Sequence, residues 1–158
     1  KRQRSNKKKE RKGMNLERLM ESVKKHEGYR NKVYLDTLGK RTVGVGHLCT
    51  EDWWEDDKEY EEEFLMKILE EDLQEAIEGA STLMLQHECT DIDEKAHEIL
   101  IEMVFQLGMT GVSKFKNMWK ALSEYNYTGA SYEMLDSKWA KQTPNRAKSM
   151  AEQMKACG

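Results

Sequence analysis

The sequence predicts an α+β protein that is mostly helical, with one small β patch set among helices. Charged residues make up 35% of the 158-residue chain, and most of the chain carries apolar residues at helical spacing, as in the stripe Phe64, Ile68, Leu69 and Leu73. The stretch HEGYRNKVYLDTLGKRTVGVGH, residues 26–47, is instead β-prone and rich in glycine. One proline and ten glycines in the whole chain favour long regular elements.

Apolar periodicity and capping signals predict the helices in order. An amphipathic helix is expected over residues 14–25, and a long helix from about Glu59 to near Gly79. Asp91, followed three residues later by Glu94, predicts the cap of a strongly apolar core helix. The remaining predicted helices are one in 113–125, one in 131–142, and a short last one with Thr143 as N-cap and Pro144 at its first position.

Two β-prone runs predict a hairpin. KVYLD and KRTVGVG, joined by TLG, cover residues 32–46 and have the composition of paired strands around a glycine turn. The predicted architecture is therefore a β hairpin attached to a helical bundle.

Charge is distributed unevenly along the chain. Residues 1–13 hold eight Lys or Arg against one Glu, while the remainder holds 18 basic and 28 acidic residues. Such a basic segment can bind nucleic acid, anionic lipid or an anionic wall polymer, although a solvated, disordered tail is the commoner outcome. The acidic body argues against nucleic acid as the main partner.

Targeting signals and membrane spans are not visible in the sequence. No apolar run approaches the ~20 residues that cross a bilayer, and no signal-peptide core follows the basic N-terminus. We therefore expect synthesis in the cytosol and no transmembrane segment.

The cysteines and histidines do not predict a metal site. Cys49, Cys89 and Cys157 are odd in number and lack CxxC spacing, so a reduced compartment is the simpler interpretation, with one disulfide plus a free thiol allowed. His47, His26 and Cys49 are spaced more loosely than paired zinc ligands. No metal or organic cofactor is expected.

The β-prone stretch carries residues suited to glycoside hydrolysis. That reaction uses two carboxyl groups, one to protonate the leaving oxygen and one to activate water or attack the sugar. Glu27 follows a predicted helix end, Asp36 lies at the hairpin edge, and the Thr42 hydroxyl could hold a water. Spacing alone is weak evidence, because 35% of the residues are charged.

The residues themselves resemble the T-even phage-type lysozyme family. That family's pattern has E-G, then D-T-x-G, then T-[IV]-G-[IV]-G-H-L, which HEGYRNKVYLDTLGKRTVGVGHL follows. MVFQLGMTGVSKFKNM resembles the family's central core helix and the turn after it, and SKWAKQTPNRAK resembles its Trp-containing helix and following Arg. The three blocks come in the family's order over residues 14–156, and only the basic tail at 1–13 lies outside the resemblance.

The resemblance implies a lysozyme-like fold and a set of site residues. A single domain over residues 14–158 would hold a small β lobe at about 26–58 and a larger helical lobe at 59–158, with a cleft between them and helix 14–25 packed on the helical lobe. Glu27 would be the general acid, Asp36 the catalytic aspartate and Thr42 the residue that positions water. The implied substrate-binding residues are Gly46, Leu48, Phe105, Gln106, Met118 and Glu133.

Three further residues are implied to support the site. Arg146 would hold the orientation of Glu27, and His47 would pair with Asp72 to tie the β patch to the bundle.

The chain also departs from the family. Only 23 residues separate Leu48 from Asp72, so the small lobe should lose a third strand or a short helix. Met118 and Glu133 replace small or amide residues that contact sugar, which puts the glycan preference in doubt. Trp53 and Trp54 fit a packing lid better than a sugar platform, and Trp139 and the methionines fit the core.

These observations predict a monomeric muramidase that cleaves the β-1,4 bond between N-acetylmuramic acid and N-acetylglucosamine in bacterial peptidoglycan after release from its cell of synthesis. A lytic transglycosylase would need the glutamate but not Asp36 and Thr42. A wall-binding protein without activity would need none of the catalytic set. A third alternative is a nucleic-acid binder that acts through residues 1–13.

Overall fold

The computed structural model describes residues 16–158, so the basic segment 1–13 and the predicted helix start at 14–15 lie outside the described residues. The described chain divides into two compact units, the first ending at Gln74 and the second covering Glu75–Gly158. The predicted α+β, mostly helical class is confirmed. No helix within residues 16–158 is long and apolar enough to cross a membrane.

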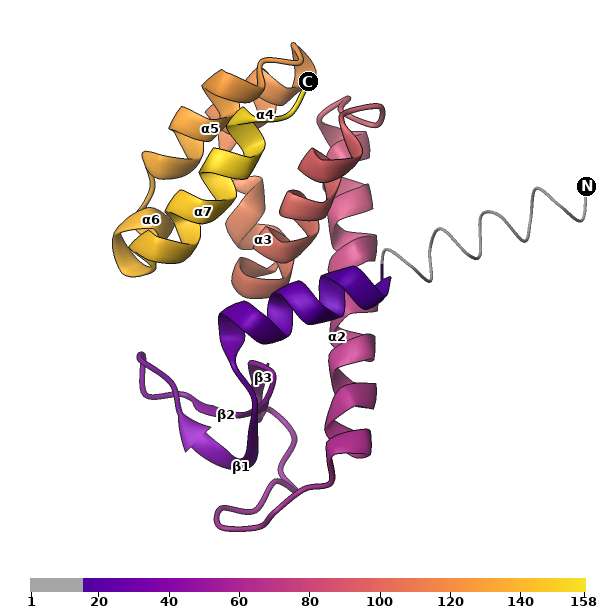
Figure 1. The fold of residues 1–158 in the computed structure, drawn as a ribbon, viewed down its shortest axis with the longest axis vertical. Coiled ribbons are helices and arrows are strands. Elements are labelled where there is room, and N and C mark those ends of the chain that lie inside the picture. The colour runs from indigo at the N-terminus through magenta and orange to yellow at the C-terminus, as the bar shows by residue number, and fades with distance from the viewer. Residues whose placement is uncertain (1–15) are drawn as a thin grey trace, which may run out of the picture. The chain divides into compact units, whose positions relative to one another are not determined.

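The first unit joins a helix to a small sheet (Figure 1). A helix over 16–27 leads into β1 (Arg30–Leu35), which pairs antiparallel with β2 (Arg41–Gly44), and β2 pairs antiparallel with β3 (His47–Leu48). The predicted hairpin is therefore present, and its second strand is the centre of a three-stranded sheet.

The short segment after β3 contains turns but no helix. The sequence predicted the loss of either a third strand or a short helix. A third strand of two residues, β3, is present, and residues 49–61 contain no helix. The segment is anchored to the sheet because the Tyr60 backbone N–H donates to the Asn31 carbonyl at 2.9 Å.

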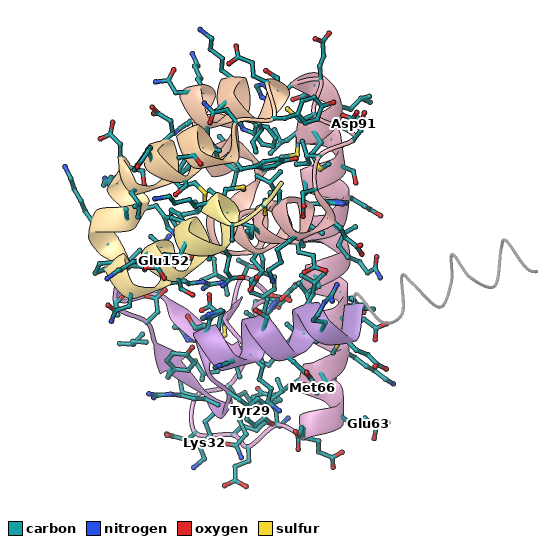
Figure 2. The ribbon with its side chains drawn as sticks, turned by 45° about the horizontal axis from the view of Figure 1, so that its top comes forward. Tyr29, Lys32, Glu63, Met66, Asp91 and Glu152 are labelled. Carbon is teal, nitrogen blue, oxygen red and sulfur yellow. The ribbon has the colours of Figure 1, made fainter. Side chains whose placement is uncertain are left out.

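The first unit has its own apolar core. Val43, Trp54, Tyr60 and Leu65 are buried together, and Tyr29 and Met66, both labelled in Figure 2, pack against them. Trp54 is 3% exposed, as a packing lid requires, whereas Trp53 is 50% exposed.

Helix α2 (Glu62–Gln86) begins in the first unit and ends in the second. The predicted end near Gly79 is wrong, because the helix continues to Gln86. A Cβ at Gly79 would lie 3.1 Å from Val104 Cγ1, so this glycine permits close packing inside the helix instead of ending it.

The second unit contains the helices that follow α2. They are α3 (Glu94–Ser113), α4 (Lys116–Ser123), α5 (Tyr127–Leu135), α6 (Lys138–Gln142) and α7 (Pro144–Lys155). The single helix predicted for 131–142 is wrong, because Ser137 interrupts it. The Ser137 hydroxyl donates to the Met134 carbonyl at 2.7 Å and accepts from the Ala140 N–H at 3.1 Å, which ends α5 and caps α6.

Of two predicted caps, one differs from the structure and the other is in place without a side-chain hydrogen bond. Asp93, not Asp91, caps α3 by accepting from the Lys95 N–H at 2.8 Å. Thr143 is the N-cap of α7 and Pro144 occupies its first turn, as predicted, but the Thr143 hydroxyl donates back to the Trp139 carbonyl at 3.1 Å and makes no hydrogen bond to the start of α7.

The second unit is packed around buried aromatic and methionine side chains. Trp119, Trp139, Met103, Met134 and Met150 are all at most 4% exposed, which confirms that Trp139 and these methionines belong to the core. The three cysteines are free thiols.

Candidate active site

Glu27 is the last residue of the helix over 16–27. Gly28 follows it with a φ of 76°, and the Gly28 N–H donates to the Lys24 carbonyl at 2.8 Å. Because a left-handed glycine commonly ends a helix, the sequence itself places this half-buried carboxylate at the point where helix gives way to sheet.

The Glu27 carboxylate lies against the turn between β2 and β3. A Cβ built on Gly46 would lie 3.1 Å from Glu27 Oε2 and 3.3 Å from Cδ. Gly46 also has a φ of 69°. Glycine is thus favoured here both by the backbone conformation and by the closeness of the acid.

Asp36 organises the hairpin turn. Its Oδ1 accepts from the Leu38 N–H at 2.9 Å and the Lys40 N–H at 2.8 Å, and Gly39 completes the turn with a φ of 76°. Both bonds use Oδ1, which leaves Oδ2 able to accept a proton from a water or a substrate.

Thr42 lies on the central strand and shares a partner with Asp36. Its Cα is paired with Tyr34 in β1 and with Leu48 in β3. The Thr42 hydroxyl donates to the Lys40 carbonyl at 2.9 Å. Because its proton is used in that bond, the Thr42 oxygen can only accept from a water.

Electrostatics also relate the two acids. The pKa of Tyr34 is raised by burial first, then by the negative charges of Glu27 and Asp36, with Arg30 acting in the opposite sense. Both carboxylates therefore act on one ring of β1. Glu27, Asp36 and Thr42, the three predicted catalytic residues, all lie in the first unit.

His47 lies between two carboxylates. Its Nδ1 is 2.8 Å from Asp72 Oδ2 on α2, and its Nε2 is 3.0 Å from Glu51 Oε1. The hydrogen bond to Asp72 is the main reason that the His47 pKa is raised; burial opposes it, and Glu51 adds to it. The hydrogen bond between His47 and Asp72 joins β3 to α2.

Glu51 was not among the predicted site residues. Burial disfavours its charged form, but donors from its own backbone, Thr50, His47 and the Trp54 indole leave its pKa lowered. The spacing of four residues between His47 and Glu51 could have indicated that they pair. The many other acids in residues 51–63 make that one pairing hard to recognise from the sequence. No group of His, Cys, Asp and Glu within residues 16–158 could hold a metal ion.

The other predicted residues divide between the units. Leu48, in the first unit, is 44% exposed. In the second unit, Phe105 and Gln106 are half-buried on α3, and the Trp139 indole N–H donates to Gln106 Oε1 at 2.9 Å. Arg146 is half-buried in the first turn of α7.

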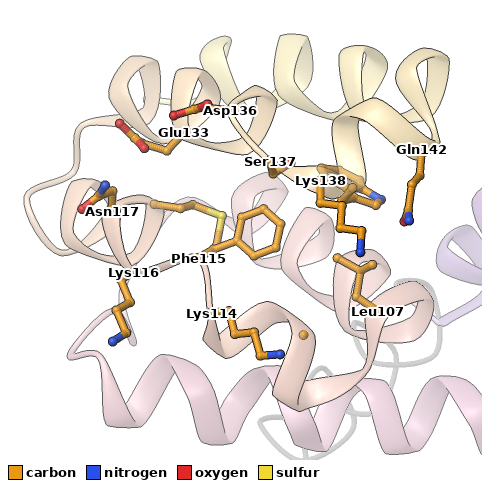
Figure 3. Close-up of a pocket in the computed structure, with 13 residues that line it drawn as sticks. Leu107, Lys114, Phe115, Lys116, Asn117, Glu133, Asp136, Ser137, Lys138 and Gln142 are labelled. Carbon is orange, nitrogen blue, oxygen red and sulfur yellow. The ribbon is translucent and has the colours of Figure 1, made fainter.

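Glu133 and Met118 line a cavity of about 670 Å³ within the second unit (Figure 3). Glu133 and Asp136 lie on one side of it and Lys114 on the opposite side. Met118 has no exposed surface, so it shapes the wall and offers no hydrogen bond. Other residues that line the cavity and that sequence reasoning missed include Phe115, Lys116, Asn117, Ser137, Lys138 and Gln142.

Comparison with known proteins relates the chain to one family. The Phage lysozyme family model matches residues 24–156. Probable T4-type lysozymes 2 and 1 of Dictyostelium discoideum are each 31% identical, with 82% of this chain and 88% of the relative covered. The pre-baseplate central spike protein Gp5 of Enterobacteria phage T4 is 29% identical over 82% of this chain and 26% of that protein.

Proposed function

Because the chain belongs to the phage lysozyme family and is a lysozyme-type glycoside hydrolase, we propose that it cleaves the β-1,4 bond between N-acetylmuramic acid and N-acetylglucosamine in bacterial peptidoglycan, and so lyses bacterial walls. The main structural support for this proposal is the local arrangement around the two acids. The Glu27 carboxylate touches the turn at Gly46, while Asp36 and Thr42 of the same unit are joined through Lys40.

Glu27 is the general acid in this mechanism. It gives its proton to the glycosidic oxygen as the bond from that oxygen to the anomeric carbon breaks, and positive charge develops on the sugar ring. The contact with Gly46 limits where the carboxyl group can point. Arg146 keeps the supporting role that the family resemblance gives it.

Asp36 and Thr42 direct the attacking water. Asp36 Oδ2 and the Thr42 oxygen can both accept hydrogen bonds. In the proposed mechanism one water donates to both and presents a lone pair to the anomeric carbon. The water adds its hydroxyl to that carbon and passes its proton to Asp36. This single displacement inverts the configuration and gives the α-anomer first.

Substrate contacts are proposed from both units. Gly46 and Leu48 contribute from the first unit, and Phe105, Gln106 and Glu133 from the second. Met118 contributes shape alone, because it is buried. The proposed partner is peptidoglycan, the protein acts as a monomer, and its place of action is the bacterial wall after release.

The test is digestion of purified peptidoglycan with analysis of the new chain ends. Mass spectrometry should find reducing N-acetylmuramic acid, and proton NMR of a defined muropeptide should find the α-anomer first. A 1,6-anhydro end would identify a lytic transglycosylase, and binding without cleavage would identify a wall-binding protein. A β-anomer that forms first would make Asp36 a nucleophile and remove the water-holding role of Thr42.

A further inference from the structure

The first unit exposes an aromatic surface, which we call the aromatic face and define as Trp53 and Phe64. Trp53 is 50% exposed and Phe64 40% exposed, and their ring centroids are 6.0 Å apart. Trp53 stacks at 4.3 Å on Trp54, which is 3% exposed. The exposed Trp53 ring is thus held in place by the buried Trp54 ring. Its exposed surface therefore has a fixed position in the first unit.

Carboxylates surround the aromatic face. Residues 51–63 hold nine acidic side chains against one lysine, and all of these acids except Glu51 are exposed. Several of them form ion pairs: Glu55 with Lys58, Asp56 with Arg41, Glu59 with Lys32, and Glu62 with Lys24.

Four of these acids are left without a cation. Within residues 16–158 no ion pair joins Asp52, Asp57, Glu61 or Glu63 to a basic group. Figure 2 shows Glu63 at the start of α2, on the outside of the helix. The helix dipole favours acids in this first turn, but it does not account for Asp52 and Asp57.

We propose that residues 1–13 of the same chain dock on the aromatic face. This segment carries eight Lys or Arg against one Glu, a charge that is opposite in sign and similar in size to the excess of acid in residues 51–63. Lysine and arginine also bind aromatic rings through cation–π contacts. A neutral glycan would cover the rings but leave the four carboxylates uncompensated, and an anionic wall polymer would be repelled.

The segment can reach the face without leaving the first unit. Lys24, on the helix that follows the segment, lies 3.5 Å from Glu62 at the start of α2. The helix from residue 16 to Lys24 is about 12 Å long at ~1.5 Å per residue. Thirteen extended residues span up to about 45 Å, so the chain length exceeds the distance it has to cover.

Docking would withhold the basic segment from anionic polymers. The attraction joins exposed charges, so it weakens as salt rises and the Debye length falls from ~10 Å at 0.1 M to ~3 Å at 1 M. Binding of the segment to the body therefore competes with its binding to any wall or lipid surface at low ionic strength.

The experiment uses the full chain and NMR signals of the Trp53 indole and the Asp52, Glu61 and Glu63 amides. The wild type is compared with a variant, called the neutralised variant, in which Lys7→Gln, Lys8→Gln, Lys9→Gln, Arg11→Gln and Lys12→Gln remove five of the eight basic charges of the segment. The reporters should shift between low salt and about 1 M salt in the wild type, and this shift should be largely lost in the variant. The Trp139 indole, in the second unit, should not respond.

A matched pair of surface variants locates the docking site. Glu61→Lys with Glu63→Lys should abolish the Trp53 response, whereas Glu70→Lys with Glu71→Lys, the same charge change further along the chain, should preserve it. Equal loss in both pairs would mean unspecific attraction and would overturn the proposal.

Three further results would also overturn it. Identical spectra for wild type and the neutralised variant would show that the segment does not dock. A response that grows with protein concentration would place the segment of a second copy on the face. A Trp53 shift on adding an N-acetylglucosamine oligomer, with no effect of neutralisation, would make the face a glycan surface.

Discussion

The contact between Gly46 and Glu27 couples a backbone conformation to the position of the acid. Gly46→Ala should lower stability by about 1–2 kcal/mol, because an L-residue is strained at positive φ, and should also displace the carboxylate. Gly39→Ala is the matched control, since Gly39 has a φ of 76° and a Cβ added there would meet nothing within 4 Å. Unfolding curves should show similar losses, while peptidoglycan turnover should fall more for Gly46→Ala. Equal turnover in the two variants would contradict the contact's role.

His47 should stabilise the fold in a pH-dependent way. Its pKa is raised in the folded state, so its contribution is fully present below the unfolded value of ~6.5 and is lost as pH rises through the folded value. His47→Asn should cost about 1–3 kcal/mol near pH 6, since charged hydrogen bonds are lost, and less in alkaline solution. Melting temperatures measured across pH test this. A variant that melts like wild type but cannot turn over substrate would make His47 catalytic.

The candidate site was predictable as far as its residues lie in one continuous stretch. Glu27, Asp36, Thr42 and Gly46 come from residues 26–47, where local turns place Glu27 against Gly46 and join Asp36 and Thr42 through Lys40. Glu51 escaped prediction because its partner is His47, and an acid in a run of acids gives no sign of which one is paired.

Among the elements, α3 offers a direct comparison of two aspartates near one helix start. Asp93→Ala should destabilise the second unit by about 1 kcal/mol, the usual value of an N-cap, because it leaves the Lys95 N–H without its acceptor. Asp91→Ala removes only an exposed bond from the Tyr125 hydroxyl and should cost less. Chemical denaturation of both variants measures this difference, and a larger loss for Asp91→Ala would contradict the assigned cap.

Element types were predictable, but some boundaries were not. The hairpin and most helices follow from periodicity and turn residues. Gly79 was wrongly predicted to end the helix, because its role is close packing against Val104. That tertiary contact cannot be read from the local sequence. The break at Ser137 was not predicted, because a serine by itself only weakly disfavours a helix. The break depends on the hydrogen bond from the Ser137 hydroxyl to the Met134 carbonyl.

Over the whole molecule, the proposed chemistry and the cavity lined by Glu133 fall in different units. The three catalytic candidates all precede Gln74, whereas the cavity is formed wholly within the second unit. The cavity residues come from the end of α3 and from α4, α5 and α6, so no single sequence motif marks them. The lining of the cavity includes charges of both signs, Lys114 and Asp136 among them, beside apolar side chains such as Phe115.

In the proposed mechanism Glu27 supplies the proton that breaks the glycosidic bond. Glu27→Gln keeps the shape of the side chain but cannot donate that proton, and Glu21→Gln makes the same change at an exposed site on the same helix. The measurement is the rate of reducing-end release from purified peptidoglycan, with circular dichroism as a check that both variants are folded. Glu27→Gln should lose about 10²–10⁴-fold in rate, and Glu21→Gln should match wild type. A folded Glu27→Gln variant that retains more than half of the wild-type rate would contradict the account.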